Sequence, residues 1–224
     1  MNKGILTRSV LLVTLIAVVT SAPAPAAPAE VQSASLLGNR DAGKSETAIG
    51  DLVADAIRAA LRTDVALVAA SELKPLHPPL EAGKVKVTDI TALAAYPEDR
   101  LAVLSIDGKT LKAALEKSVS IYPQPSLGFL QVSGLRFTLD PSKKQGERVV
   151  AGRVGNAALD DGKTYTVGLS MSLAKGALGY WRLWSDDAAK PGPPGITTAK
   201  AIENYLAANR KIDYSSLDRI TIAR

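Results

Sequence analysis

The sequence has no cysteine, a single histidine (His77), and few aromatic residues, which make up 4% of its 224 positions. Without cysteine there is no disulfide, no thiolate nucleophile and no zinc site with sulfur ligands. A single histidine excludes every two-histidine metal motif and any Ser-His-Asp triad built on another residue. His77 stands in Leu76-His77-Pro78-Pro79, a pattern typical of surface loops. We therefore expect no catalytic residue, no metal site and no cofactor.

A clustered basic surface is also missing. Lys and Arg number 27 against 22 Asp and Glu, but the bases are scattered, and Lys143-Lys144 is a basic pair inside a polar turn. Nucleic-acid-binding domains usually combine a basic stripe with interleaved aromatics. We therefore expect no nucleic-acid partner.

The N-terminus has the order of a secretory signal. Lys3 and Arg8 precede an apolar run, 10–19, and an Ala/Pro-rich stretch follows. The alternative, a membrane anchor, is disfavoured because ten apolar residues are too few to span a bilayer, which needs about 20. We predict a signal peptide over 1–26 and a periplasmic or extracellular protein with no membrane contact after cleavage. Residues 27–35 are predicted to form a flexible tail, and residues before about Leu36 to lie outside the packed core.

Helical periodicity is strongest over residues 45–62, where apolar residues recur on one face. The pattern predicts a helix capped by Ser45 or Thr47, with Asp51, Asp55 and Arg58 facing water.

Shorter patterns complete a single domain over 36–224. The continuous apolar run 65–69 predicts a buried strand, and alternating side chains predict half-buried strands at 135–139 and 165–171. Mixed helices and strands without a strict βαβ rhythm indicate an α+β fold. The other predicted elements are strands at 100–106 and 219–222, helices at 88–94 and 109–119, a helix capped by Thr198, a Pro-rich loop at 74–81 and a break at 191–195.

Several short motifs occur in an order that resembles the C-terminal domain of the 5'-nucleotidases. The resemblance covers about residues 36–222, so it includes nearly the whole predicted domain. The motifs are Glu46-Thr47-Ala48-Ile49-Gly50-Asp51-Leu52-Val53-Ala54-Asp55-Ala56, Ala82-Gly83-Lys84-Val85, Thr88-Asp89-Ile90, Ile106-Asp107-Gly108-Lys109-Thr110-Leu111, Val132-Ser133-Gly134-Leu135-Arg136-Phe137, Tyr165-Thr166-Val167 and Asp218-Arg219-Ile220.

The resemblance implies a division of labour. In that family an N-terminal domain holds two metal ions on Asp, His and Asn ligands and hydrolyses the substrate, whereas the C-terminal domain binds the nucleoside. One histidine cannot supply that ligand set, so we expect no two-metal hydrolysis by this chain alone. Two hypotheses follow: a non-catalytic binding or scaffolding domain, with weak binding of a nucleoside or other small molecule, or a substrate-recognition component acting with a separate metallophosphatase protein.

Five positions depart from the family pattern. The family Asn and Arg correspond to Ala69 and Lys74, one stacking Phe to Glu98, the second aromatic to a position near Ser172, and the ribose-binding Asp to Leu178. Stacking contributes about 1–3 kcal/mol per base, and a lysine cannot copy an arginine fork. We expect nucleotide binding in the family manner to be weak or absent, and these positions to converge on one hollow. Glu98 would repel a phosphate there or pair with Lys74.

Aromatic residues near that edge allow another pocket. Tyr180, Trp181 and Trp184 follow the Gly176–Gly179 segment. They provide either alternative ligand contacts, chiefly Tyr180 and Trp181, or ordinary packing.

Residues Gly38–Ser45 satisfy the phosphate-loop pattern G-x-x-x-x-G-K-[ST]. The preceding segment, 31–37, is a poor strand because Ser and Gln interrupt it. An ordinary loop leading to a helix cap explains the same residues, and we favour that interpretation.

Overall fold

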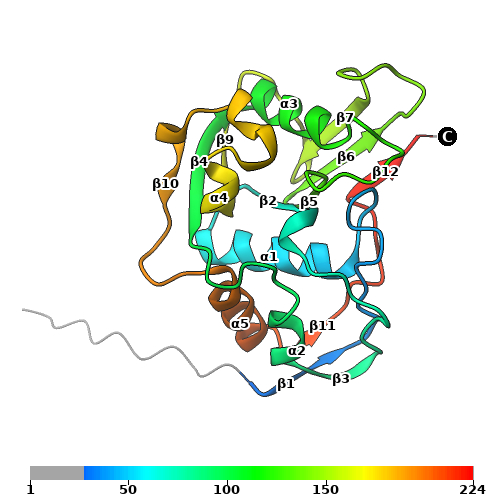
Figure 1. Cartoon of the computed structure of the whole chain (residues 1–224), viewed down its shortest axis with the longest axis vertical. Helices are drawn as coiled ribbons and strands as arrows, with labels where there is room; N and C mark the ends of the chain where they lie inside the picture. The colour runs from blue at the N-terminus through cyan, green and yellow to red at the C-terminus, as the bar shows by residue number, and fades with distance from the viewer. Residues whose placement is uncertain (1–27, 224) are drawn as a thin grey trace, which may run out of the picture.

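The largest sheet has five strands in the order β10-β4-β9-β2-β5 (Figure 1). In the computed structural model, which describes residues 28–223, β2 runs parallel to β9, and the other neighbours are antiparallel. The α+β prediction is confirmed; the predicted signal peptide, 1–26, lies outside the described residues. The strands are β2 (Val65–Ala69), β4 (Leu101–Asp107), β5 (Leu130–Ser133), β9 (Thr164–Ser170) and β10 (Lys190–Pro191).

This sheet separates two hydrophobic cores. Ala66 and Val68 of β2 pack with α1 (Ala48–Leu61) and α5 (Thr198–Ala208), whereas Val65 and Leu67 pack with α3 (Gly108–Ser118) and α4 (Met171–Ala174) on the other face (Figure 1). Because successive side chains of a strand point to opposite faces, a strand between two cores must be apolar throughout. All five residues of β2 are buried, as the continuous apolar run predicts.

Two smaller sheets extend the fold. One has the order β11-β1-β3, and the other β12-β6-β7-β8. Their strands are β1 (Glu30–Ser33), β3 (Gly83–Lys86), β6 (Leu135–Leu139), β7 (Val149–Val154), β8 (Ala157–Ala158), β11 (Lys211–Ile212) and β12 (Ile220–Ile222); the remaining helices are α2 (Val87–Thr91) and the 3₁₀ turns η1 (Ala70–Glu72), η2 (Ala177–Arg182) and η3 (Asp186–Ala188).

The prediction that residues before Leu36 lie outside the core is wrong from Glu30 onward. β1 pairs along its length with β3 and also pairs with β11. Val31 is only 3% exposed and belongs to the core that contains α1. The backbone hydrogen bonds that hold β1 depend on partners distant in sequence, so local composition gave no sign of them.

Helix starts are largely, but not entirely, as predicted. Thr47 caps α1 by accepting a hydrogen bond from the Gly50 amide at 3.2 Å. The last helix is capped by Thr197 rather than Thr198, and α2 begins after Lys86 and is not capped by Thr88. Among residues 28–223, no helix combines the length and apolarity needed to cross a membrane.

Candidate functional site

A hollow of about 220 Å³ lies where β2 and β9 end. We call it the Tyr96 hollow. Parallel strands bring the segments that follow them to the same edge of a sheet. Here η1 follows β2, and α4 and η2 follow β9. The hollow is lined by Ser71, Glu72, Tyr96, Ser172, Leu173, Ala177 and Leu178.

Backbone hydrogen bonds hold the loop that carries Tyr96 against η1. The amide of Ala95, which directly precedes Tyr96 in the chain, donates to the Glu72 carbonyl at 2.8 Å. The Ser172 amide, on the opposite wall, donates to the Asp99 carboxylate at 3.3 Å. The walls of the hollow therefore come from three segments joined by main-chain amides that donate to a carbonyl and to a carboxylate, while Tyr96 stays 60% exposed.

Glu72 supplies the charged group of the hollow. Its Oε2 accepts a hydrogen bond from the Ala69 amide at 2.7 Å. Burial raises the pKa of Glu72 to about 7, because the ionised carboxylate loses solvation. None of the described residues that line the hollow is basic, so nothing in its wall attracts a phosphate.

The rim of the hollow has an uncommon backbone conformation. Leu178 has a φ of +59°, in the left-handed region that a residue with a side chain seldom occupies. Its side chain is 39% exposed and forms part of the wall. Such positions cluster at ligand sites, which makes this rim a candidate binding edge.

The structure brings two of the five predicted positions together. Ser172 and Leu178 line the Tyr96 hollow, whereas Ala69, Lys74 and Glu98 do not. Ala69 is fully buried, and Lys74 and Glu98 are exposed. Within residues 28–223, the suggested Lys74–Glu98 ion pair does not form.

The alternative aromatic pocket does not form at this site. Tyr180 is fully buried, stacks on Trp184 with ring centroids 5.4 Å apart, and donates its hydroxyl to the Gly128 carbonyl at 2.8 Å. Trp181 is 60% exposed, lies near Arg182, and is not part of the hollow. Packing therefore accounts for Tyr180, as one of the two interpretations expects.

Five of the seven residues that line the hollow were not predicted, and Tyr96 and Glu72 are the two of them that bear an aromatic ring or a charge. Tyr96 precedes Pro97 by one position, and an exposed aromatic next to a loop proline in an aromatic-poor chain was the available signal. Glu72 gave no signal, because its burial depends on contacts with loops distant in sequence.

The Gly38–Ser45 segment is an ordinary loop. The helix begins three residues after Ser45, at Ala48, and the amides of Lys44 and Ser45 donate to the Asp41 carbonyl. The Lys44 ammonium pairs with the Asp41 carboxylate at 3.4 Å. These amides are thus turned toward the loop itself rather than toward a ligand, in agreement with the favoured interpretation.

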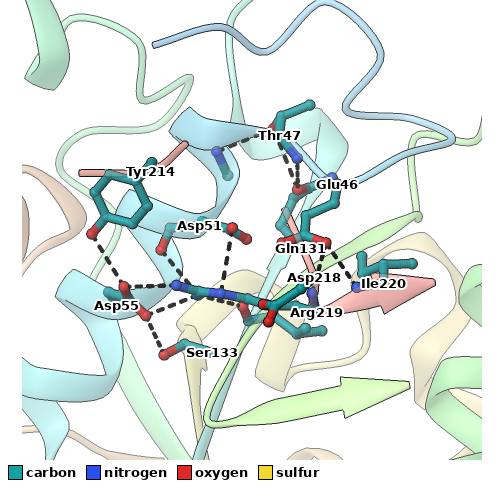
Figure 2. A network of polar contacts seen from close by, with 12 residues as sticks. Glu46, Thr47, Asp51, Asp55, Gln131, Ser133, Tyr214, Asp218, Arg219 and Ile220 are labelled. Carbon is teal, nitrogen blue, oxygen red and sulfur yellow. Dashed lines mark hydrogen bonds and ion pairs between the residues drawn. The ribbon is translucent and has the colours of Figure 1, made fainter. Parts of the chain in front are cut away.

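A buried polar network lies at the opposite edge of the sheet (Figure 2). Arg219 reaches from the start of β12 to α1, where its two terminal nitrogens each contact an Asp55 carboxylate oxygen at 2.9 Å. Its Nε lies 3.3 Å from Asp51. Asp51 is fully buried and Asp55 half-buried, so the prediction that both face water is wrong. The helical periodicity was right, but the polar face is covered by a chain segment more than 150 residues away.

The network contains more acids than bases. Asp51 and Asp55 contact the Arg219 guanidinium, which forms its two-pronged contact with Asp55, whereas Glu46 contacts backbone amides (Figure 2). Burial, and after it the neighbouring Glu46 carboxyl group, raises the pKa of Asp51 to about 9, although the Arg219 guanidinium acts in the opposite direction. Asp51 is therefore protonated at neutral pH, and Glu46 accepts hydrogen bonds from the amides of Arg219 and Ile220 at 2.8 Å each.

Within residues 28–223, no three His, Cys, Asp or Glu side chains are placed to hold a metal ion. The acids of the Arg219 network face a guanidinium and backbone amides, so this donor set does not fit a two-metal centre.

Comparisons with known proteins agree on one family. The family model described as "5'-nucleotidase, C-terminal domain" matches residues 24–183. An apyrase of Aedes albopictus is 28% identical over 155 residues, which are 65% of this chain and 27% of the mosquito protein. A snake venom 5'-nucleotidase of Naja atra is 33% identical over 122 residues, 51% of this chain and 23% of the venom protein.

Solved structures give the same result. A 5'-nucleotidase precursor from Thermus thermophilus superposes with a TM-score of 0.76 and 26% identity, over 87% of this chain and 39% of that one. The NAD nucleotidase of Haemophilus influenzae shares the fold at a TM-score of 0.71 and 19% identity, over 87% and 38% of the two chains. The chain thus spans about a quarter of the curated relatives and about two fifths of these structures.

Proposed function

Because the chain belongs to the 5'-nucleotidase C-terminal domain family, we propose that it is an exported, non-catalytic binding domain whose Tyr96 hollow holds an uncharged organic ring. The ring of a nucleoside is the expected ligand type, bound weakly and without recognition of a phosphate. The observation that carries this proposal is the composition of the hollow: an exposed tyrosine and apolar walls around one carboxyl group, with no basic residue among the described lining.

The size and chemistry of the hollow support a ring rather than a whole nucleotide. Its volume of about 220 Å³ is below the roughly 300–1,000 Å³ of pockets that enclose drug-sized ligands. Tyr96 offers a face for stacking, worth about 1–3 kcal/mol per base. Leu178 stands where the resemblance places a ribose-binding Asp, and Ser172 where it places a second aromatic, so two family contacts are replaced.

Export is proposed from two observations. The order of basic start, apolar run and Ala/Pro-rich stretch over residues 1–29 is that of a signal peptide. The named relatives include venom 5'-nucleotidases, which are secreted proteins by that description. Mass spectrometry of the exported chain tests this: an N-terminus near Ala27 is expected, and an intact Met1 on the mature protein would contradict export.

Ring binding is tested with a matched pair of substitutions. Tyr96 and Trp181 are equally exposed, at 60% each, but only Tyr96 lines the hollow. Titration with adenosine should give weak, saturable binding that Tyr96→Ala reduces by roughly tenfold, through loss of stacking. Trp181→Ala should leave the affinity unchanged. Loss of binding in Trp181→Ala alone would instead place the ligand at the other aromatic surface and overturn the proposal.

The non-catalytic part of the proposal is tested by phosphate release. The purified protein is expected not to hydrolyse AMP, ADP or UDP-sugars with Mn²⁺, Zn²⁺ or Co²⁺ present, because the described acids and His77 are not arranged to hold two metals. Metal-dependent release that co-purifies with the protein and disappears on its mutation would contradict this expectation.

A second candidate function rests on the match to 5'-nucleotidases together with the lack of a metal-binding group of acids or histidine among residues 28–223. In this alternative, the chain supplies substrate recognition to a separate metallophosphatase. A neighbouring metallophosphatase should then co-elute with this protein and lose nucleotidase activity when Tyr96→Ala replaces the wild type. If the metallophosphatase shows the same nucleotidase activity without this chain, the second function is excluded.

A further inference from the structure

A groove of about 650 Å³ opens at the edge of the sheet where β2 and β9 begin. We call it the Arg58 groove. It lies between the C-terminal half of α1, the turns that join β5 to β6 and β7 to β8, and the start of β9. Its volume is within the range of small-molecule sites, and its position is separate from the Tyr96 hollow, which lies beyond the other ends of β2 and β9.

Positive charge predominates in the groove. Its lining includes four basic residues against two acidic ones: Arg58, Arg136, Lys163 and Arg219 against Asp55 and Asp64. Both acids already have partners in the fold. Asp55 accepts two hydrogen bonds from Arg219, and the Asp64 carboxylate accepts from the Thr166 amide and hydroxyl at 2.8 Å each.

Two of the four bases have no ion-pair partner among the described residues. Among residues 28–223, neither Arg58 nor Lys163 forms an ion pair with a carboxylate. Arg58 donates its Nε to the Ser133 hydroxyl at 2.9 Å, which fixes the guanidinium at the groove wall. Lys163 lies 5.2 Å from the centroid of the Tyr165 ring. Two positively charged groups thus line the groove without a direct ion pair to a carboxylate among the described residues.

The neighbouring sheet adds an independent observation. Arg136 of β6 and Arg153 of β7 are direct cross-strand partners in the antiparallel register. Like charges directly opposite each other destabilise a pair of strands. Arg136 forms an ion pair with Asp218 at 3.5 Å, but both side chains are more than half exposed, so the contact compensates little. An anion bound beside this pair would relieve the repulsion.

We propose that the Arg58 groove binds a small solute through a phosphate or sulfate group. Arg58 presents its terminal nitrogens as a fork, the geometry that suits an oxyanion, and Lys163 adds a point charge from the other wall. Arg136 and Arg153 raise the local potential at the rim. This site is independent of the Tyr96 hollow and of the function proposed for it.

Calorimetric titration with inorganic phosphate, pyrophosphate and sulfate tests the site. Saturable binding of one of these anions is expected, weakening as salt is added. Each of Arg58→Gln and Lys163→Gln should reduce the affinity by roughly tenfold, since a hydrogen bond to a charged group contributes about 1.5–3 kcal/mol. Tighter binding of pyrophosphate than of sulfate would identify a phosphorylated solute, and the reverse order a sulfated one.

Two further variants keep this test decisive. Lys84→Gln removes an exposed base of β3 that is outside the groove, and its affinity should equal that of the wild type. Arg58→Lys keeps the charge but loses the fork, so it should bind at an intermediate strength and guards against misfolding of Arg58→Gln. The proposal is overturned if no anion binds saturably, or if Lys84→Gln weakens binding as much as the groove variants do.

Discussion

The Tyr96 hollow and the Arg58 groove lie at the two ends of the same pair of parallel strands, β2 and β9. β2 itself, Val65–Ala69, spans roughly 15 Å at about 3.3 Å per residue, with Asp64 of the groove before it and Ser71 of the hollow after it. The hollow is small, largely apolar and lined by one acid and no base within the described residues. The groove is three times larger, polar and lined by four bases and two acids.

The fold therefore keeps the proposed ring-binding surface and the proposed anion-binding surface apart. At the hollow end, the strands lead into short turns whose backbone groups bond one another, so apolar side chains and Tyr96 form the surface. At the groove end, Arg219 crosses from β12 to the acids of α1 and holds the polar residues in place (Figure 2).

Replacing Arg219 should lower the free energy of unfolding more than any other substitution considered for either end of β2 and β9. Arg219→Gln leaves Asp55, half-buried, and Asp51, fully buried, without their guanidinium, and breaking such a pair costs about 3–5 kcal/mol. Because Asp51 is protonated and Arg219 is partly exposed, we expect the lower end, about 3 kcal/mol, in urea unfolding. Arg210→Gln, at an exposed base, should change stability by less than about 0.5 kcal/mol. Equal effects of the two substitutions would refute the structural role of the network.

Asp51, in the Arg219 network, should also dominate the pH dependence of stability. The pKa of Asp51 is 3.8 when unfolded and about 9 when folded, so the folded chain binds the extra proton between those values. This stabilisation is complete below about pH 3.8 and is lost progressively as pH rises toward 9.

Asp51→Asn mimics the protonated carboxyl and should flatten this slope. Urea midpoints at pH 5, 7 and 9 measure it, with Asp89→Asn, an exposed acid of α2, as the control. A slope in Asp51→Asn that parallels the wild type would show that Asp51 is ionised in the folded protein.

The hollow end should contribute a narrower pH effect. Burial raises the pKa of Glu72 from 4.5 to about 7, so its stabilising protonation is complete below about pH 4.5 and is lost by about pH 7. Glu72→Gln should remove pH dependence only within that window, whereas Glu81→Gln, in an exposed loop, should not. If Glu72→Gln changes the pH dependence of stability up to pH 9, then Glu72 and Asp51 do not titrate independently.

The smallest effect is expected at Leu178. Asn tolerates the left-handed conformation better than Leu does, so Leu178→Asn should stabilise the fold by about 0.5–1 kcal/mol while weakening ring binding. Leu217→Asn, at an exposed leucine without a positive φ, provides the control for thermal melting. Loss of stability at Leu178 would show that its packing outweighs its backbone strain.

The sequence predicted local features better than distant ones. The buried run of β2, the α1 periodicity and the Thr47 cap all depend on residues close in the chain, and all are confirmed. The strand β1 and the burial of Asp51 depend on partners far along the chain, namely β3, β11 and Arg219, and both were mispredicted.

The same distinction applies to the two sites. The family resemblance led to Ser172 and Leu178, because their motifs are local, but Tyr96 and Glu72 became part of the hollow only through folding. The Arg58 groove could not be predicted, because scattered bases on α1, β6 and the start of β9 meet only in three dimensions.

The most direct test of this account compares adenosine with AMP in titrations of the wild type and of Tyr96→Ala. If the hollow holds a ring and no base attends it, AMP should bind no more tightly than adenosine, and Tyr96→Ala should weaken adenosine binding by roughly tenfold. The Arg58 groove cannot assist, since it lies at the opposite end of β2, a strand roughly 15 Å long. Binding of AMP at least tenfold more tightly than adenosine, abolished by Tyr96→Ala, would place phosphate recognition at the hollow and contradict the separation of the two ends.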